Sequence, residues 1–398
     1  MPTESSAAPL RAVIDARPAL ERQRTGVGHY TDQLLRRLPA ADPQSAYIAW
    51  YLDARGSHRG TFTGIAPNLT EAVSRFPARV FGRLSSRAGW PRVESRSGRF
   101  DVLLATNFLP PQTRSRGVVL VVHDLAFEVL PDTAPHVNER FRDHLRRWLQ
   151  RAAGTIVPSV SARDDLIRLH DVDPARIEVV HHGADARSRP APPEAVADVR
   201  RRFGIAEGPF ILFVGGIEPR KNLERLVRAF GASVTRDGEA AGASFVIAGG
   251  AVPWFPSAGE RVDAAIAGLP AAARGRVIRT GYVDENDRDA LLAGAVALAY
   301  PSLYEGFGFP VLEAFAAGLP VLTSNVSSLP EVAGDAALLV DPLDESAISH
   351  GLSALLGDPA AREQLAQAGR ERVAMFSWEA CAKGTAEVLH KAHAWAQG

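Results

Sequence analysis

Two glutamates, Glu305 and Glu313, stand eight positions apart, with Gly-Phe-Gly-Phe-Pro at residues 306–310 between them. The backbone N–H groups of a glycine loop and a helix start can bind a phosphate. Carboxylates beside them can accept hydrogen bonds from sugar hydroxyls. Together, these residues predict a site for a sugar nucleotide. Taken singly, each glutamate would be an ordinary residue of a helix end or a solvated loop.

The elements around the two glutamates follow from the neighbouring residues. Residues 295–300 are apolar and predict a short buried strand before the loop. Pro310 suits the first position of a helix, which places Glu313 in the first turn. Gly318 and then Pro320 end the helix after about two turns, and a strand resumes at residues 321–323.

A cationic pair, Arg220 and Lys221, follows another apolar run at residues 210–214. If that run is a strand, the pair lies at its carboxyl end, where α/β sheets bind ligands. Arginine can clamp two phosphate oxygens and lysine adds a point charge, so the pair suits a diphosphate. It would also stabilise the charge of a departing diphosphate. Asn222 is the expected N-cap of the next helix. A solvated surface pair is the alternative.

His123 follows the apolar run at residues 118–122, so it too comes at the end of a predicted strand. There it could bond a substrate hydroxyl near a reacting centre, or it could be a structural histidine. Gly26 and Gly28 lie between a first strand at residues 11–15 and a helix at residues 28–38. The third glycine of the dinucleotide fingerprint is missing, which disfavours a nicotinamide oxidoreductase.

Composition narrows the class of protein. The 398 residues exceed what one core usually serves, so we expect two domains. Lys+Arg and Asp+Glu both number 45, so no net charge favours nucleic acid as a partner. The single cysteine, Cys381, fits a reducing cytoplasm. We expect no export signal and no membrane span, because no apolar run approaches about 20 residues. The chain contains Asp-x-Asp patterns, which can bind metal ions, but no further candidate metal ligands cluster with them. We therefore expect no metal site.

Strand and helix patterns alternate through both halves of the chain, which predicts the α/β class with parallel sheets. We expect two doubly wound Rossmann-like domains that face one another across a cleft. The predicted domains are residues 1–187 and residues 209–376. A linker at residues 188–208 separates them, because its prolines interrupt regular structure.

Four arginines recur every fourth residue, and apolar residues lie between them. They are Arg75, Arg79, Arg83 and Arg87. Such a segment can lie on an anionic membrane surface, where it would bind lipid or a lipid-linked acceptor. A solvated arginine face on a helix interrupted by prolines is the alternative.

Over residues 13–382 the chain resembles the retaining glycosyltransferases of family 4. The resemblance rests on Glu305 to Glu313, on Glu-Pro-Arg-Lys-Asn at residues 218–222 and on Thr-Gly-Val-Gly at residues 25–28. Residues 307–340, which include Ser-Ser-Leu-Pro-Glu-Val, are similar to bacterial mannosyl- and rhamnosyltransferases of surface polysaccharide synthesis, such as that of lipopolysaccharide.

The resemblance implies the two-domain glycosyltransferase-B fold. It places the nucleotide-sugar donor on the second domain and the acceptor on the first, with the final helix, residues 377–398, returning to the first domain. It further implies metal-independent transfer with retention, no cofactor, and a donor for which GDP-mannose is favoured. The acceptor would be a glycan or a lipid-linked hydroxyl.

The resemblance also assigns roles to single residues. Glu313 would bind the ribose, Glu305 the donor sugar hydroxyls, and Arg220 with Lys221 the diphosphate. The remaining positions are Gly306, Phe307 and Gly308 beside the diphosphate, Tyr282 and Val283 at the base, His123 at the donor sugar, and Gly26 and Gly28 approaching phosphate from the first domain. Many members of the family have arginine where this chain has Gly216.

Two other functions fit the same residues. A nucleotide-sugar epimerase would bind the same diphosphate and sugar but would use no acceptor. A non-catalytic sensor would bind the donor without releasing nucleoside diphosphate.

Overall fold

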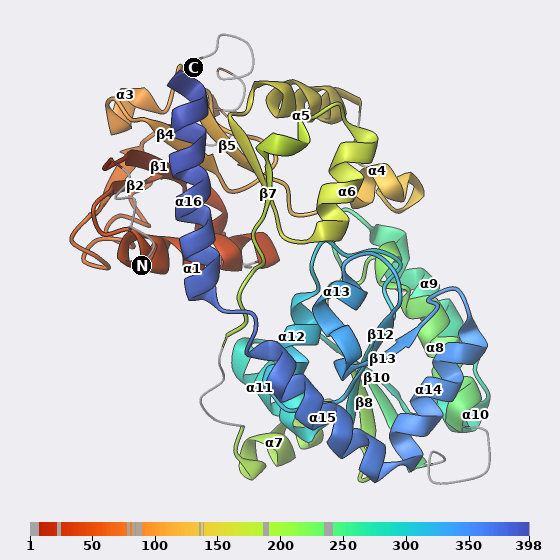
Figure 1. The fold of residues 1–398 in the computed structure, drawn as a ribbon. Helices are drawn as coiled ribbons and strands as arrows, with labels where there is room; N and C mark the ends of the chain where they lie inside the picture. Colours follow the sequence, from red (N-terminus) through yellow and green to blue (C-terminus); the bar gives the residue numbers. More distant parts are fainter. Residues whose placement is uncertain are drawn as a thin grey trace, which may run out of the picture. The chain divides into compact units, whose positions relative to one another are not determined.

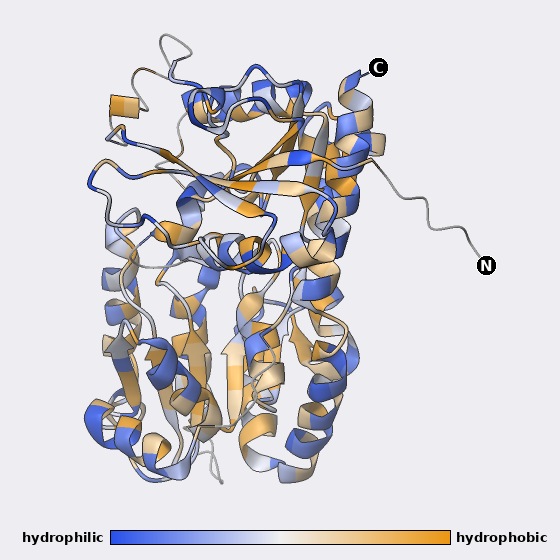
Figure 2. Ribbon diagram, turned by 90° about the vertical axis from the view of Figure 1, so that its left-hand side faces the viewer, coloured by the Kyte–Doolittle hydropathy of each residue, from blue (hydrophilic) through white to orange (hydrophobic). Residues whose placement is uncertain are grey.

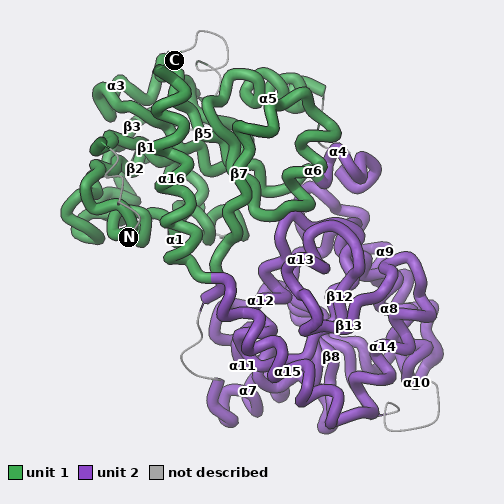
Figure 3. The backbone as a smooth tube through the Cα atoms, in the orientation of Figure 1, with its two compact units in different colours: residues 1–125, 137–183, 377–398 green, residues 126–136, 184–376 purple. Residues whose placement is uncertain are grey.

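The computed structural model describes residues 8–21, 25–77, 80–81, 84, 90–134, 137, 139–185, 191–234 and 242–397. The chain forms two compact units, shown in two colours in Figure 3. Unit 1 comprises Met1–Leu125, Val137–Gly183 and Ser377–Gly398, and unit 2 comprises Ala126–His136 and Ala184–Phe376.

Within the described residues, unit 1 is built on a seven-stranded parallel sheet in the order β3-β2-β1-β4-β5-β6-β7. Its strands are β1 (Arg11–Asp15), β2 (Ala46–Leu52), β3 (Leu69–Ser74), β4 (Val102–Ala105), β5 (Gly117–Val121), β6 (Gly154–Val157) and β7 (Ile177–Val179). The central strands β4, β5 and β6 are buried along their whole length, as expected for parallel strands covered on both faces.

Helices cover both faces of this sheet (Figure 1). They are η1 (Arg17–Leu20), α1 (Gly26–Ala41), α3 (Glu94–Ser97), α5 (Glu139–Arg151), α6 (Val160–Leu169), η3 (Pro174–Arg176) and α16 (Trp378–Gln397). The last helix, α16, belongs to unit 1 and packs against α1, β5 and β6. It corresponds to the final helix that the family resemblance assigns to the first domain.

Unit 2 contains a six-stranded parallel sheet, again within the described residues, in the order β10-β9-β8-β11-β12-β13. Its strands are β8 (Phe210–Val214), β9 (Ser244–Ala248), β10 (Val277–Gly281), β11 (Ala297–Tyr300), β12 (Val321–Ser324) and β13 (Leu338–Val340). The chain runs outward from β8 to β10 and then returns to place β11 on the other side of β8. The sheet therefore reverses its strand order between β8 and β11.

The helices of unit 2 connect these strands. They are α7 (Pro193–Phe203), η4 (Pro219–Lys221), α8 (Leu223–Val234), α9 (Pro256–Ala267), α10 (Ala271–Arg274), α11 (Glu285–Gly294), α12 (Phe309–Ala316), α13 (Leu329–Ala333), η6 (Gly334–Ala336), α14 (Glu345–Gly357) and α15 (Pro359–Val373). The short helices α4 (Ala126–Val129) and η2 (Pro131–Thr133) group with unit 2 as well.

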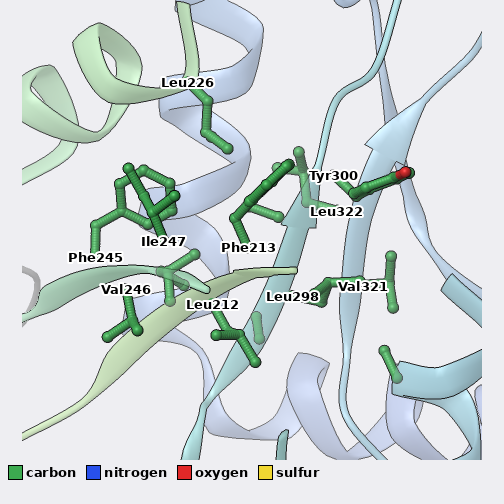
Figure 4. Packing of buried hydrophobic residues seen from close by; sticks show 14 of the residues in the cluster. Leu212, Phe213, Leu226, Phe245, Val246, Ile247, Leu298, Tyr300, Val321 and Leu322 are labelled. Atoms are coloured by element: carbon green, nitrogen blue, oxygen red, sulfur yellow. The ribbon is translucent and has the colours of Figure 1, made fainter. Parts of the chain in front are cut away.

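Apolar side chains of the strands form the core of unit 2. In Figure 4, Phe213 of β8 lies beside Tyr300 of β11, and their ring centroids are 5.8 Å apart. Both residues are fully buried. In Figure 2 the hydrophobic colour follows the strands, while the helices carry hydrophilic residues on their outer sides. The predicted α/β class with two parallel sheets is confirmed.

The predicted linker at residues 188–208 is wrong over much of its length. It contains α7 (Pro193–Phe203), which belongs to unit 2 and packs against α11. The prolines that suggested a linker instead start this helix: Pro192 is its N-cap and Pro193 its first residue. Proline fits there because the first N–H of a helix has no partner within the helix.

The arginine segment is only partly described. Arg75 follows the end of β3, whereas Arg79, Arg83 and Arg87 lie outside the described residues. Over the described part of the chain, no helix combines the length and apolarity that a membrane crossing requires.

Candidate functional site

The reversal of strand order in unit 2 places two loops side by side. Residues 215–222 follow β8 and residues 301–308 follow β11. Because neighbouring parallel strands end at the same edge of a sheet, both loops leave that edge together, at the point where α/β folds bind ligands. The backbone N–H of Leu303 donates to the carbonyl oxygen of Arg220 at 2.8 Å and joins the loops.

A buried ion cluster occupies this junction. Lys221 Nζ lies 2.5 Å from Glu305 Oε1, and Arg220 Nη1 lies 2.7 Å from Glu305 Oε2. Glu305 is 6% exposed and Lys221 is 7% exposed. The structure thus brings three of the predicted catalytic residues into direct contact, although they come from loops more than 80 residues apart.

Tyr300 completes the cluster, and the sequence reasoning missed it. Its hydroxyl donates to Glu305 Oε1 at 2.8 Å and accepts a hydrogen bond from Lys221 Nζ. Lys221 Nζ also lies 4.8 Å from the centroid of the tyrosine ring. The signal for this role was Tyr300's position as the last residue of β11, where an apolar strand meets the ligand edge.

The cluster is strongly coupled electrostatically. Burial alone would raise the pKa of Glu305, but the charges of Arg220 and Lys221 lower it to about 2. Burial, and then the neighbouring Arg220, lower the pKa of Lys221. Burial and the carboxylate of Glu305 raise the pKa of Tyr300 well above its ordinary value. Glu305 is therefore ionised, and Tyr300 remains a neutral hydrogen-bond donor, at neutral pH.

Arg220 is held by two further contacts. Its Nε lies 3.0 Å from Glu218 Oε2, and its Nη1 donates to the carbonyl oxygen of Tyr304 at 3.1 Å. Glu218 was another residue that the sequence reasoning did not single out. These contacts orient the guanidinium before any ligand arrives.

Two serines, Ser327 and Ser328, fix the glycine loop. The backbone N–H of Glu305 donates to Ser327 Oγ at 3.0 Å. Ser328 Oγ donates to the carbonyl oxygens of Glu305 and Phe307, each at 2.9 Å. Gly308 has φ 112°, and a Cβ there would lie 2.9 Å from a methyl carbon of Leu329. Only glycine therefore fits at position 308.

The buried loop residues Gly306 and Gly308 could approach a ligand only through their backbone. Phe307 has its side chain in the hydrophobic core, where its ring contacts Phe309 and Phe376. Pro310 is the second residue of α12 and not the first, which was the prediction, and Gly318 follows the end of the helix with φ 69°.

Glu313 lies in a different turn of α12 from the one that we predicted. The helix starts at Phe309, so Glu313 belongs to its second turn and not to its first. Glu313 Oε1 lies 3.2 Å from Nη1 of Arg288, in the first turn of α11. Both residues stay near the ligand edge, because helices that follow parallel strands begin there. Glu313 therefore forms a second ion pair, with Arg288, which the sequence reasoning also missed.

We predicted Asn222 as the N-cap of the helix that follows it. In the structure, however, Asn222 lacks the extended backbone conformation of an ordinary N-cap. Its φ is 61°, its side-chain oxygen accepts from Nη1 of Arg225, and its side-chain amide donates to the carbonyl oxygens of Pro301 and Pro342. It ties together the loops after β8, β11 and β13. At Gly216 a Cβ would lie 2.7 Å from a methyl carbon of Val252, so the space beside this glycine is already filled.

Tyr282 and Val283 follow β10 at the same edge. Tyr282 is 67% exposed, and a Cβ at Gly250 would lie 3.7 Å from its Cβ, so the backbone of Tyr282 runs beside the loop after β9. Val283 is half-buried and packs on the core. Of the two residues predicted at the base, Tyr282 alone presents an open ring.

His123 follows β5 in unit 1, where both ring nitrogens have partners. Its Nε2 donates to the carbonyl oxygen of Thr106 at 2.8 Å, so its Nδ1 accepts a hydrogen bond from His182 Nε2 at 3.3 Å. The rings of Tyr30 and Trp378 lie against His182. Burial lowers the pKa of His123, and burial followed by His123 lowers that of His182 well below its ordinary value. Both imidazoles are neutral.

Gly26 and Gly28 belong to the first turn of α1, which begins two residues earlier than predicted. Thr25 is the N-cap, and its Oγ1 accepts from the backbone N–H of Gly28 at 3.4 Å. Gly26 is exposed and Gly28 is buried.

Two family models match the chain. The model for Glycosyltransferase Family 4 matches residues 24–188, and the model for Glycosyl transferases group 1 matches residues 197–372. Together they cover most of both units.

Curated relatives and solved structures agree with this match. The O-antigen chain mannosyltransferase B of Escherichia coli is 29% identical over 392 residues, which cover 94% of this chain and 98% of the relative. A D-inositol 3-phosphate glycosyltransferase of Nocardioides sp. is 32% identical over 374 residues, covering 86% of this chain and 77% of the relative.

Anabaena HepE, whose crystal structure is in complex with UDP and glucose, has the same fold with a TM-score of 0.71 and 15% identity. The similarity covers 96% of this chain and 99% of that one. The chain therefore belongs to glycosyltransferase family 4 and is a glycosyltransferase of the glycosyltransferase-B fold.

Proposed function

We propose that the protein transfers a hexose, mannose or a deoxyhexose, from a nucleoside-diphosphate sugar to a hydroxyl group of a glycan or lipid-linked acceptor in bacterial polysaccharide synthesis. Unit 2 binds the donor and unit 1 the acceptor. Transfer retains the anomeric configuration and needs no metal ion. GDP-mannose is the favoured donor, since a mannosyltransferase is the relative that matches over nearly its whole length.

The buried cluster of Arg220, Lys221 and Glu305 carries this proposal. A diphosphate needs cationic donors at the edge where the strand order reverses, and these two cations stand there. Lys221 uses two of its three N–H donors on Glu305 and Tyr300, counting partners among the described residues. The third can bind a phosphate oxygen.

Glu305 acts in two ways in this proposal. It holds both cations in place, and it bonds a hydroxyl of the donor sugar. A carboxylate has about four lone-pair positions. Lys221, Tyr300 and Arg220 use three of them, with two bonds on Oε1 and one on Oε2. Oε2 can therefore accept one further hydrogen bond from the sugar.

The chemical step is a substitution on one face of the sugar. The bond between the anomeric carbon and the diphosphate oxygen breaks, and its electron pair leaves with the diphosphate. Arg220 and Lys221 stabilise the charge that develops there. The acceptor hydroxyl oxygen bonds to the anomeric carbon from the same side and passes its proton to the diphosphate.

The other predicted residues have supporting roles in this proposal. Glu313 binds the ribose from the second turn of α12, and Tyr282 stacks on the base with its exposed ring. His123 contacts the donor sugar by exchanging the contact between its Nδ1 and His182 for a sugar hydroxyl, while Gly26 and Gly28 approach phosphate. The single cysteine, Cys381, is buried and forms no disulfide, which fits a reaction in the reducing cytoplasm.

A two-stage experiment tests this function. A thermal-shift panel of GDP, UDP, dTDP and ADP identifies the nucleotide, since a ligand at 100 times its Kd stabilises the protein by about 2.7 kcal/mol. The matching nucleotide sugar is then incubated with a glycan acceptor, with and without EDTA. We expect release of nucleoside diphosphate only with acceptor, unchanged by EDTA, and an α-linked product from an α-linked donor. An inverted product, or epimerised donor without acceptor, would contradict the proposal.

A further inference from the structure

Unit 1 contains a cavity of about 430 Å³ at the amino ends of three neighbouring strands, β5, β6 and β7. Its lining comes from the residues just before these strands, from α5 and from the end of α16: Arg114, Ser115, Arg116, Val118, Trp148, Arg151, Ala153, Arg176, Trp395 and Ala396. In parallel sheets the amino ends share one edge. The cavity therefore lies at the edge opposite to His123, which follows the carboxyl end of β5.

The cavity is lined by four arginines, whose charge is poorly balanced. Among the described residues, no carboxylate lies within 4 Å of the guanidinium groups of Arg114, Arg116 or Arg151, and Arg176 has only Asp173, at 3.9 Å. Arginines gathered around a cavity without counter-charges repel one another. An anion bound among them would remove that repulsion and form charge-assisted hydrogen bonds.

Two indole rings line the same cavity. Trp148 is buried, and its Nε1 donates to His144 Nε2 at 2.9 Å, which fixes the ring. The Cζ atom of Arg151 lies over the same ring, 5.0 Å from its centroid. Trp395 is half-buried at the end of α16. A Cβ at Gly154 would lie 3.3 Å from Cζ3 of Trp395, so the glycine that starts β6 makes room for this ring.

We propose that this cavity is a second binding site, for a saccharide that carries a phosphate or carboxylate group. The guanidinium groups would bind the oxyanion, and the indole of Trp395 would stack on the apolar face of the sugar ring. The volume falls within the range of small-molecule sites, about 300–1,000 Å³. The lining residues belong to unit 1, whereas the proposed donor site belongs to unit 2, so binding here can be tested independently of the proposed transfer.

Isothermal titration calorimetry of the full chain tests the site, with glucose 6-phosphate and glucuronate as probes and glucose and inorganic phosphate for comparison. A saturating nucleoside diphosphate occupies the donor site throughout. We expect saturable binding of at least one anionic sugar, at least about tenfold tighter than glucose or phosphate, a difference of about 1.4 kcal/mol.

The test variant is Arg116→Glu with Arg151→Glu, and the control is Arg140→Glu with Arg201→Glu. All four arginines are exposed, and both pairs change the net charge equally. Circular dichroism checks that each variant is folded. The test variant should weaken binding at least about tenfold, while the control stays within about twofold of the wild type, a difference of about 0.4 kcal/mol.

Three results would overturn the inference. The first is the absence of saturable binding for both anionic sugars up to about 10 mM, which corresponds to about −2.7 kcal/mol. The second is equal affinity of inorganic phosphate, which would leave the indole rings without a role. The third is unchanged binding in the test variant, which would place the ligand elsewhere on the protein.

Discussion

Replacing Glu305 by glutamine removes the carboxylate that, within the described part of the chain, alone contacts both Arg220 and Lys221. The amide keeps the shape of the side chain, but half of its polar end becomes a donor that faces other donors. Lys221 is buried, and Tyr300 is its only other side-chain hydrogen-bond partner among the described residues. The variant therefore leaves a buried positive charge without its compensating negative charge.

The pKa of Glu305 gives the magnitude of this effect. A value of about 2, against the ordinary 4.5, means that the folded protein stabilises the ionised carboxylate by about 3 kcal/mol. Removing one partner of a buried pair costs about 3–5 kcal/mol, which agrees. Unit 2 has about 200 residues, so a loss of about 3 kcal/mol lowers its melting temperature by about 6–12 °C.

The sign of the pH dependence follows from the direction of the shift. The folded pKa lies below the unfolded one, so the stabilisation is complete above about pH 5 and is lost as the pH falls toward 2. The difference in melting temperature between wild type and Glu305→Gln should therefore be largest at neutral pH and shrink in acid.

Differential scanning calorimetry at pH 7 and at lower pH measures this, with Glu218→Gln as the matched control. Glu218 is 21% exposed at its side chain, and its one ion pair with a described residue is with Arg220, at 3.0 Å, while Arg220 keeps Glu305. We expect the control to lose less than about 1 kcal/mol. An equal loss in the two variants, or a difference that persists unchanged at low pH, would refute the reasoning.

Three further predictions concern single residues. Lys221→Ala should lower kcat/KM by at least about 100-fold with the fold intact, and steady-state turnover within threefold of wild type, about 0.65 kcal/mol, would contradict the diphosphate role. Tyr300→Phe keeps the ring but removes the hydroxyl that bonds Glu305, so we expect turnover to fall about tenfold, about 1.4 kcal/mol, and unchanged kinetics would show that the hydroxyl is dispensable. Burial, and then His123, depress the pKa of His182, so the wild type should lose stability as the pH falls below about 6.5. Urea unfolding at pH 7 and pH 5 should show a smaller loss for His182→Asn, and an equal loss of unfolding free energy in the two proteins would contradict this.

The sequence predicted those elements whose burial leaves a continuous apolar run. The strands β1 and β8 have the predicted bounds, because most of their residues are buried and apolar. Short strands at the sheet edge were not predicted. Leu338–Val340 in β13 is an example: one residue is exposed, one half-buried and one buried, so no periodicity appears over three residues.

The candidate site was predicted in its parts but not in its connections. Arg220, Lys221 and Glu305 were recognisable from residue type and from their place after strands. Their direct pairing depends on β11 lying beside β8, which the linear order of the strands does not reveal. Tyr300 was not predicted for the same reason. An aromatic residue at the end of an apolar run is expected in the core, and Lys221, which bonds its hydroxyl, lies 79 positions away.

Glu313 shows the limit of counting along a helix. The proline rule placed Pro310 at the first position of the helix, but it is the second residue. The helix starts at Phe309, and this one-residue difference moves Glu313 into the second turn, beside Arg288. Helix ends are set by local backbone geometry, here the left-handed Gly308, which sequence patterns fix only to within a residue or two.

The central claim is that Lys221 and Arg220 bind the diphosphate of the donor. Calorimetric titration with the nucleoside diphosphate chosen by thermal shift tests it most directly, with Lys221→Ala compared against Lys383→Ala, whose lysine is exposed on α16. The account predicts that Lys221→Ala raises the Kd of the diphosphate at least about tenfold, about 1.4 kcal/mol, but leaves the Kd of the nucleoside unchanged. Equal affinity of wild type and Lys221→Ala for the diphosphate would contradict it.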